Sequence, residues 1–375
     1  MKVGFYGHVR QYQNIQKEID ANIQKVLMSG EYVHGPMNKQ FEKEFAEFSG
    51  TKYAIPCGNG TDALWLTLMA LGLGKGDEVI TNANTFFATA EAIWIAGATA
   101  VLVDCDPKTK CIDPVAAEKA ITGRTRCIMP VHLYGQCADM PAIKKLADKY
   151  KLWVIEDNAQ AVGAAGDTFK IGELSDAVAT SFIIQKNLGC FGDGGAIVTN
   201  NEQIHRVTKL LRAHGSPARN VHSFGFNSRL DDIQAGILSA KLKHIHAGND
   251  ERIQWAARYT AGLQGSKSFD RPYAKPGYRH VWHLYVIEAK IPAHRDAMVE
   301  FLNKNGVDAK TDYSIAIHQQ AGFPWDKDAR VVGPLTHAEH NAATCISLPM
   351  FPELTAAEVD FVIAKCKEMD ALFSK

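Results

Sequence analysis

Residues 99–157, TAVLVDCDPKTKCIDPVAAEKAITGRTRCIMPVHLYGQCADMPAIKKLADKYKLWVIED, alternate short apolar runs with amphipathic stretches. The runs AVLVD and WVIED are apolar on both faces, which is typical of strands covered on both sides by helices. Between them, DPVAAEKAIT and MPAIKKLADKYK have the spacing of apolar side chains that an amphipathic helix shows. This alternation predicts an α/β fold with an open, mostly parallel sheet between helices.

The same pattern continues on both sides of this stretch. Further strands are predicted at residues 52–57, 77–81, 126–134, 179–184 and 194–200, and a helix at 88–97. The last three predicted strands, which begin with LWVIEDNA, follow one another without a clear helix. Part of the sheet is therefore expected to be mixed.

After about residue 201 the alternation of strands and helices gives way to longer helical patterns. Helices are predicted over 202–215 and 230–263, and the longer one is expected to bridge two lobes. The later sequence predicts a smaller α+β portion that ends in a helix over 355–373, with a loop at 322–334. We expect a large domain at 1–250, with an N-terminal helix near residues 12–32, and a small C-terminal α+β domain at 251–375.

Composition limits the possible function classes. The 375 residues carry 41 basic and 41 acidic side chains, so no long-range field favours nucleic acid or an anionic membrane as a partner. The eight cysteines form no CxxC pair, which favours reduced thiols. The N-terminus lacks the apolar region of a signal peptide, and no apolar run is long enough to cross a bilayer. A cytoplasmic protein is expected.

A possible phosphate seat lies in CGNGTDALWLTLMAL, residues 57–71. A predicted strand ends near Cys57, and Gly58 to Thr61 open an amphipathic helix. Backbone N–H groups at a helix N-terminus, with a hydroxyl beside them, suit a phosphate. A turn followed by a helix cap would give the same pattern and is commoner. The motif is neither a P-loop nor a dinucleotide fingerprint.

Two segments hold an acid and an amine where cofactor chemistry would need them. Asp157 ends the apolar strand of WVIEDNAQ, where a carboxylate is costly unless it meets a cation such as a pyridinium nitrogen. Gln160 follows, within reach of the same ring. In TSFIIQKNLGCFGDGG, Lys186 lies between an apolar strand and a glycine-rich turn, where burial would lower its pKa and favour a Schiff-base role. A strand-end cap and a solvated lysine are the alternatives.

The lysine segment and six other ordered segments resemble the DegT/DnrJ/EryC1/StrS aminotransferases, which are fold-type I pyridoxal-phosphate enzymes that act mainly on keto-sugars. The lysine segment is similar to the family signature SF…K-N-L-G…GDGG. The other matching segments are GEYVHGPMNKQFEKEFAEFSG, NGTDALWL, NTFFATAEAIWIAGATAVLVDCD, EDNAQA and GFNSRLDDIQAGIL, together with PVHLYG. The resemblance implies a large domain whose mostly parallel mixed sheet is sandwiched by helices, plus the smaller C-terminal domain.

The resemblance also implies roles for individual residues. Lys186 would form the Schiff base with pyridoxal 5'-phosphate, Asp157 would face the pyridine nitrogen, and Gln160 would lie near the ring oxygen. Phe86 would stack on the ring. The phosphate cup would consist of Gly60, Thr61, Asp62 and Ser181.

Two further residues in GFNSRL concern the partner and the substrate. By the resemblance, Asn227 reaches the phosphate of the neighbouring subunit, so the chain is expected to form at least a homodimer with shared active sites. Arg229 is a candidate contact for an anionic substrate group. Both residues would otherwise be an ordinary exposed polar pair in a loop.

Several residues depart from the family pattern. Ile184 and Gln185 precede the lysine where many relatives carry a proline nearby, and Asp62 stands where alanine is commoner. An acid at that position must point away from the phosphate or be compensated. The segment TDYSIAIHQQAGF resembles the acceptor-site loop without its prolines, and His318 remains a candidate contact for a sugar hydroxyl.

The predicted reaction moves an amino group from glutamate or glutamine to a keto-sugar, most simply a nucleotide-linked keto-hexose, in aminosugar biosynthesis. Keto-inositol amination is the alternative. Sugar dehydratases of the family replace the lysine with histidine, which Lys186 argues against, and a non-catalytic cofactor-binding regulator is a further alternative. His244 and His246 are two residues apart and share no helix face, so no metal site is predicted.

Overall fold

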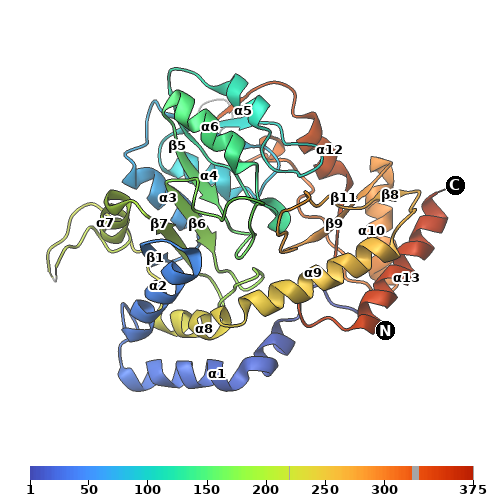
Figure 1. Ribbon diagram of the computed structural model, residues 1–375, viewed down its shortest axis with the longest axis horizontal. Helices are drawn as coiled ribbons and strands as arrows, with labels where there is room; N and C mark the ends of the chain where they lie inside the picture. The colour runs from blue at the N-terminus through green and yellow to red at the C-terminus, as the bar shows by residue number, and fades with distance from the viewer. Residues whose placement is uncertain (219, 323–328, 375) are drawn as a thin grey trace.

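The computed structural model describes residues 1–218, 220–322 and 329–374 (Figure 1). Its centre is an eight-stranded sheet with the strand order β1-β7-β6-β5-β4-β2-β3-β10. The bounds are β1 (Tyr53–Cys57), β2 (Glu78–Asn82), β3 (Thr99–Val103), β4 (Thr125–Ile128), β5 (Trp153–Asp157), β6 (Ala177–Ser181), β7 (Gly195–Thr199) and β10 (Ala329–Val331).

The sheet is mostly parallel, as the alternation of strands and helices predicts. The strands from β6 through β5, β4, β2 and β3 to β10 are parallel, whereas β7 pairs antiparallel with both β6 and β1. The prediction of a mixed region near the last strands is therefore confirmed. Because β4, β5 and β6 run the same way, their carboxyl ends lie at one edge, where ligand sites of such sheets form.

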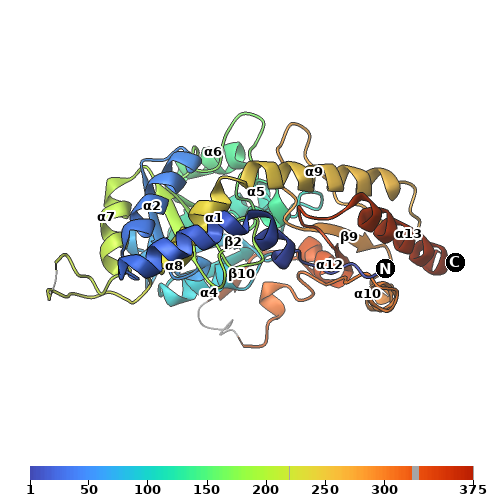
Figure 2. The same ribbon diagram turned by 90° about the horizontal axis from the view of Figure 1, so that it is seen from below.

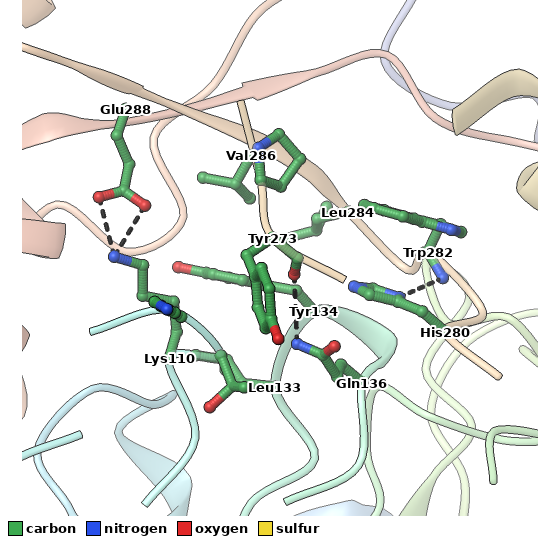
Figure 3. Close-up of a pocket in the computed structure, with 13 residues that line it drawn as sticks. Lys110, Leu133, Tyr134, Gln136, Tyr273, His280, Trp282, Leu284, Val286 and Glu288 are labelled. Carbon is green, nitrogen blue, oxygen red and sulfur yellow. Dashed lines mark hydrogen bonds and ion pairs between the residues drawn. The ribbon is translucent and has the colours of Figure 1, made fainter. Parts of the chain in front are cut away.

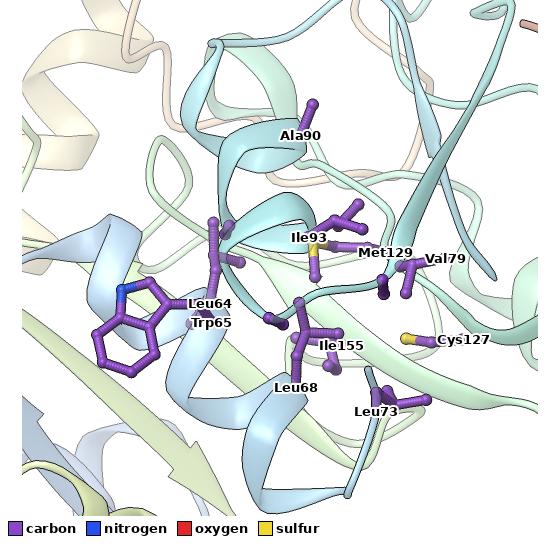
Figure 4. Close-up of a cluster of buried hydrophobic side chains, with 14 of the residues drawn as sticks. Leu64, Trp65, Leu68, Leu73, Val79, Ala90, Ile93, Cys127, Met129 and Ile155 are labelled. Carbon is purple, nitrogen blue, oxygen red and sulfur yellow. The ribbon is translucent and has the colours of Figure 1, made fainter. Parts of the chain in front are cut away.

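Helices cover both faces of the sheet. Successive strand residues point to opposite faces, so Ile197 of β7 joins one apolar core while Val198 joins another. The first core packs α3 (Gly60–Ala70) and α4 (Ala88–Ile95) on the sheet (Figure 4). The other face is covered by α5 (Pro114–Ala120), α6 (Met140–Tyr150), α2 (Pro36–Ser49) and α8 (Asp232–Leu242).

The C-terminal part has its own core around an antiparallel three-stranded sheet, β11-β9-β8. The strands are β8 (Phe269–Asp270), β9 (Tyr285–Ala289) and β11 (Cys345–Leu348). Around them lie α10 (Arg295–Lys304), α12 (Thr336–Thr344) and α13 (Ala356–Phe373). Helix α9 (Ile245–Gly262) runs from α8 to this part, and α1 (His8–Ser29) lies along α8 (Figures 1 and 2).

Several predicted elements differ from the structure. The helix predicted over 230–263 is two helices, because the chain tightens where the His244 amide donates to the Lys241 carbonyl at 3.0 Å. The strand predicted over 126–134 ends at Ile128, since Pro130 cannot donate to a ladder. The predicted helix over 202–215 ends at Leu211, as α7 (Glu202–Leu211).

The proposed domain boundary at residue 250 falls inside α9, and it stays a prediction. Three pairings among the described residues cross it: β10 joins β3 of the large sheet, Val3 bridges Val307, and Ala165 bridges Arg279. Of the loop predicted at 322–334, residues 323–328 lie outside the described residues, and Ala329–Val331 form β10. Among the described helices, none combines the length and apolar character that a bilayer crossing requires.

Candidate active site

The predicted acid and amine meet at the carboxyl edge of the large sheet. Asp157 is the last residue of β5, Ser181 is the last residue of β6, and Lys186 lies in the turn that follows β6. The first turn of α3 approaches the same edge: a Cβ atom on Gly60 would lie 2.5 Å from the Ser181 Cβ. Glycine is therefore needed at position 60 for this approach.

Asp157 is an almost fully buried carboxylate, with 5% of its surface exposed. Its Oδ2 accepts a hydrogen bond from the Thr89 hydroxyl at 2.9 Å, and its Oδ1 accepts one from the Ala159 amide at 3.1 Å. Burial raises the pKa of Asp157, while these two bonds and the Lys186 charge oppose the rise. A cation in contact with this carboxylate would offset the cost of its burial.

Lys186 carries an amine whose basicity the fold reduces. Burial lowers the pKa of Lys186 to about 8, although the charges of Asp157 and Asp312 act in the opposite direction. The turn is fixed because the Lys186 amide donates to the Ile183 carbonyl at 2.9 Å. An amine with this pKa is partly neutral, and hence nucleophilic, near neutral pH.

The residue after the lysine anchors this turn to the rest of the molecule. The Asn187 Nδ2 donates to Asn249 Oδ1 at 2.8 Å, on α9, and its Oδ1 lies 3.1 Å from Nδ1 of His283. His283 is buried, and burial lowers its pKa well below the usual value, so its ring is neutral. The lysine loop is thus tied to both lobes.

Gln160 has a side-chain orientation set by hydrogen bonds. Its Oε1 accepts from the Tyr134 amide at 2.7 Å, which requires the Nε2 group to face the other way. The Nε2 donates to the Tyr313 hydroxyl at 2.9 Å. The Phe86 ring lies 5.6 Å from that of Tyr313 and is 54% exposed, so an aromatic face is open beside these polar groups.

The start of α3 has its own set of contacts. Asn59 caps the helix by accepting from the Asp62 amide at 2.8 Å. The Asp62 carboxylate accepts from Trp65 Nε1 at 3.0 Å and from the Ser228 hydroxyl at 2.6 Å. The amide and both carboxylate oxygens of Asp62 are therefore hydrogen-bonded within the chain. The amides of Gly60 and Thr61 remain as the N–H donors that this turn can offer to a ligand.

Asn227 and Arg229 lie on either side of Ser228, which contacts Asp62 of α3. Ala213 bridges Asn227 at the base of a hairpin that projects beyond α7 (Figure 2). Asn227 is exposed, whereas Ser228 is buried and accepts a hydrogen bond from the Gly58 amide at 3.1 Å. Arg229 is half-buried. Burial lowers the pKa of the nearby His34, and the charges of Arg212 and Arg229 lower it further.

His318 lies in a short 3-10 helix, Ile317–Gln319, close to the loop that carries Phe86. The Ile317 amide donates to the Ala83 carbonyl at 3.1 Å, just after β2. His318 Nε2 lies 2.9 Å from Glu339 Oε1 of α12. Its Nδ1 atom is buried and has no hydrogen-bond partner among the described residues.

Sequence reasoning missed several residues of this site. Thr89, Tyr134 and Tyr313 contact Asp157 or Gln160 directly. Tyr313 belongs to the segment TDYSIAIHQQAGF, so the resemblance of that segment could have included it. Thr89 and Tyr134 lie in two other segments that resemble the family, NTFFATAEAIWIAGATAVLVDCD and PVHLYG. Neither was assigned a role, because their contacts with Asp157 and Gln160 form only in the folded chain.

A small cavity lies behind Tyr134, between the two lobes (Figure 3). It measures about 20 Å³, and Tyr134, Gln136, His280 and Trp282 are among its lining residues. Lys110 and Glu288 form an ion pair of 2.8 Å at one side. This volume admits about one water molecule and is far too small for a sugar.

The chain was compared with known proteins. The model of the DegT/DnrJ/EryC1/StrS aminotransferase family matches residues 13–367. The chain is 42% identical over 361 residues to a "pleiotropic regulatory protein" of Geobacillus stearothermophilus, with 96% of each chain covered. It is 40% identical over 358 residues to the dTDP-3-amino-3,4,6-trideoxy-alpha-D-glucose transaminase of Streptomyces venezuelae, which covers 95% of this chain and 93% of the relative.

Solved structures agree with these matches. The structure of DesV from S. venezuelae, in complex with a ketimine intermediate, superposes with a TM-score of 0.94 at 39% identity and covers 98% of both chains. NtdA from Bacillus subtilis, with bound cofactor PMP, superposes with a TM-score of 0.91 at 36% identity, covering 99% of this chain and 85% of that one.

Proposed function

This chain belongs to the DegT/DnrJ/EryC1/StrS aminotransferase family, and we propose that it moves an amino group from glutamate or glutamine to a nucleotide-linked keto-hexose. As a member of this family it is a pyridoxal-phosphate-dependent aminotransferase. The single observation that carries the proposed site is the placement of a buried acid, Asp157, and a partly neutral amine, Lys186, at the same carboxyl edge of the sheet.

The residues at this edge fit pyridoxal phosphate. Asp157 would face the ring nitrogen, because its buried carboxylate has no cation in direct contact among the described residues. The Gln160 Nε2 would donate to the ring oxygen, and Phe86 would cover the ring face. The amides of Gly60 and Thr61, with the hydroxyls of Thr61 and Ser181, would hold the phosphate. When bound, the cofactor supplies an aldehyde for amino groups and a ring that accepts electrons.

Lys186 would act on the proton of the amino-acid donor. Its amine, with a pKa of about 8, is suited to take the proton from the donor α-carbon and to return it during the second half of the reaction. Asp157 would keep its negative charge against the ring nitrogen, which favours the protonated ring. The bonds from Thr89 and Ala159 hold this carboxylate in one orientation.

The nature of the acceptor is inferred from relatives and from the site. Relatives that are 40–42% identical are named for dTDP- or UDP-linked sugars. His318 and Tyr313 would contact sugar hydroxyls, while Arg229 would meet an anionic group. A B. subtilis relative that is 36% identical is named for 3-oxo-glucose-6-phosphate, so a singly phosphorylated sugar is a second candidate.

The active unit is proposed to be a homodimer with shared sites. Asn227 is exposed at the base of the hairpin and would reach the phosphate bound by the partner chain. Arg229, two residues on, would belong to the same shared region. We further propose a cytoplasmic location, which the eight free cysteines support because all are buried as thiols.

A panel of acceptors tests the proposal. The holoenzyme is first converted to its pyridoxamine phosphate form with glutamate, and then dTDP- and UDP-linked 3-keto-hexoses, 3-oxo-glucose-6-phosphate and a keto-inositol are added separately. We expect return of the pyridoxal form only with a nucleotide-linked sugar. Return with the keto-inositol alone would select the aminocyclitol alternative, and failure of glutamate and glutamine in the first step would support a non-catalytic role.

A further inference from the structure

A second cavity, of about 160 Å³, shares no lining residue with the proposed cofactor site but borders the lysine turn through Asn187. It is enclosed by the first turns of α1, by the junction of α8 and α9, and by residues 352–353. Figure 1 shows the start of α1 beneath that junction. Asn14, His244 and Ala247 are exposed at the rim, so a small solute has a path from solvent.

Two buried cations line this cavity. Lys241 is 4% exposed and Arg252 is 6% exposed. Within the described part of the chain, no carboxylate lies within 4.0 Å of either side-chain nitrogen group. Burial lowers the pKa of Lys241 to about 8 and that of Arg252 to about 10, which reflects the poor solvation of both charges.

The known contacts of these cations are neutral. Lys241 Nζ donates to the Gly189 carbonyl and lies 5.3 Å from the centre of the Phe191 ring. Arg252 Nη1 donates to the carbonyls of Trp282, at 3.2 Å, and Met350, at 2.6 Å. The three carbonyls accept from one N–H group of Lys241 and from the Nη1 atom of Arg252. The other N–H groups of the two side chains remain as donors for a ligand.

The other polar lining consists of amides, two acids and His244, whose ring contacts Glu18 at 2.8 Å. Asn187 and Asn249 contribute side-chain amides, and Glu251 and Glu353 contribute carboxyl groups. Burial raises the pKa of Glu353 despite the nearby charges of Arg252 and Lys241. Because Glu353 forms no direct ion pair with either cation, it compensates them weakly.

We propose that this cavity binds a small oxyanion, of the phosphate or carboxylate type, between Lys241 and Arg252. An uncompensated buried charge is costly, and an oxyanion would pair both cations through charge-assisted hydrogen bonds. The site adjoins the catalytic turn, since Asn187 follows Lys186 and Lys241 holds the Gly189 carbonyl of the same turn. Bound water that links Glu353 to the cations is the competing occupant.

Binding to the holoenzyme tests the proposal. With cofactor bound, its own phosphate occupies the cup at α3, so added inorganic phosphate reports on other sites. We expect saturable binding of phosphate, of acetate or of both in calorimetric titrations at ionic strength fixed with sodium chloride. Binding of phosphate alone indicates a phosphate-type ligand, whereas binding of acetate alone indicates a carboxylate.

Three variants locate the site. Lys241→Met should weaken binding at least about tenfold by removing one charge, whereas Lys243→Met should leave it unchanged. Lys243 is an exposed lysine two residues away, which makes it a matched control. Glu353→Gln should tighten binding, because it removes the competing carboxylate, and it does so without disturbing the Gly189 contact of Lys241.

Two results would overturn the proposal. One is the absence of saturable binding of either anion at millimolar concentrations to the wild-type holoenzyme. The other is an equal affinity of the wild type and of Glu353→Gln for the anion. This second comparison can be made even if Lys241→Met proves unstable. Because binding is read without turnover, neither result depends on the identity of the aminotransferase substrates.

Discussion

Asp157 is the residue whose surroundings most require a positive partner. Its carboxylate is buried at a strand end, and neutral donors from Thr89 and Ala159 satisfy both oxygens without supplying charge. Lys186 contributes a positive charge only while it is protonated, and burial opposes protonation. A protonated ring nitrogen would supply the missing charge, so we expect the acid rather than the amine to determine the cofactor's electronic state.

Asp157→Asn should separate binding of the cofactor from its activation. An amide at this position keeps the shape of the side chain but no longer favours a protonated ring. We expect turnover to fall on the order of 10²–10³-fold while part of the cofactor binding is retained, as measured by kcat and by cofactor absorbance.

Thr89→Val is the matched control for this variant. It removes the hydroxyl bond at 2.9 Å but keeps the carboxylate, so its loss of turnover should be clearly smaller. Equal losses in the two variants would indicate that local geometry, not the charge of Asp157, is the important property.

The pH dependence of cofactor attachment follows from the lowered pKa of Lys186. Only the neutral amine attacks an aldehyde, and a pKa of about 8 leaves roughly one tenth of the amine neutral at pH 7. We expect the rate of attachment to the apoenzyme to rise with pH and to level off above about pH 8. The rate is measured by borohydride trapping at each pH.

Asp312→Asn tests whether nearby charge shifts the pKa of Lys186 in the expected direction. The Asp312 charge raises the pKa of Lys186, so its removal should lower that pKa further and move the midpoint to lower pH. A midpoint near that of an ordinary solvated lysine, in either protein, would contradict the burial of this amine.

Among single elements, helix α3 is expected to affect both the stability of the fold and the retention of the cofactor, because its cap also orients the amides proposed to hold the phosphate. Asn59→Ala should cost about 1 kcal/mol of unfolding free energy by removing the cap, and it should also weaken cofactor binding because the Gly60 and Thr61 amides lose their fixed direction. Denaturant unfolding and cofactor dissociation measure the two effects.

Asn201→Ala is the control, since Asn201 caps α7 through the amides of Gln203 and Ile204 at 2.9 and 3.2 Å. We expect a similar stability loss with unchanged cofactor retention. Parallel losses of cofactor in both variants would mean that general destabilisation, not the direction of the α3 amides, explains the result.

Elements with strong local patterns could be predicted from sequence, and those set by distant contacts could not. The strands at 99–103 and 153–157 could be predicted because each contains an apolar run whose side chains point to both faces of the sheet. The three residues of β10 carry no such pattern, and they become a strand because β3 offers a free edge. The break between α8 and α9 was also missed, since both sides continue a helical pattern across His244.

The same distinction applies to the candidate site. Asp157, Lys186 and Gln160 follow strand ends, so topology alone suggests that they approach one another. The hydrogen-bond partners of Gln160 are Tyr134 and Tyr313, which lie 26 and 153 positions away in the chain. No local sequence pattern predicts these contacts. Asp62 was predicted to belong to the phosphate cup, provided that its acid turned away or was compensated. Its bonds to Trp65 and Ser228 meet that condition, and its place in the cup stays a prediction.

At the scale of the whole molecule, the proposed shared site makes activity depend on two chains. Lys186→Ala chains lack the amine, and Asn227→Asp chains would place a carboxylate beside the partner's phosphate and repel it. Each homodimer should be inactive. A mixed dimer contains one site with both intact residues, so mixing should restore up to about a quarter of wild-type activity per chain for random exchange.

Subunit exchange must be demonstrated in the same mixture, for example by native mass spectrometry of differently tagged chains. A mixture of Lys186→Ala with Lys186→Ala chains bearing the second tag is the matched control and should stay inactive. Exchange without recovered activity would argue that Asn227 acts within its own chain.

If Lys186 carries the reactive amine, borohydride should fix the cofactor to this residue alone. The holoenzyme is reduced with borohydride, digested and mapped by mass spectrometry, with Lys186→Ala treated in parallel. We expect a single cofactor label on Lys186 and none in the variant, which should also lose turnover. A label on another lysine, such as the buried Lys241, or full labelling and turnover in Lys186→Ala, would contradict this expectation.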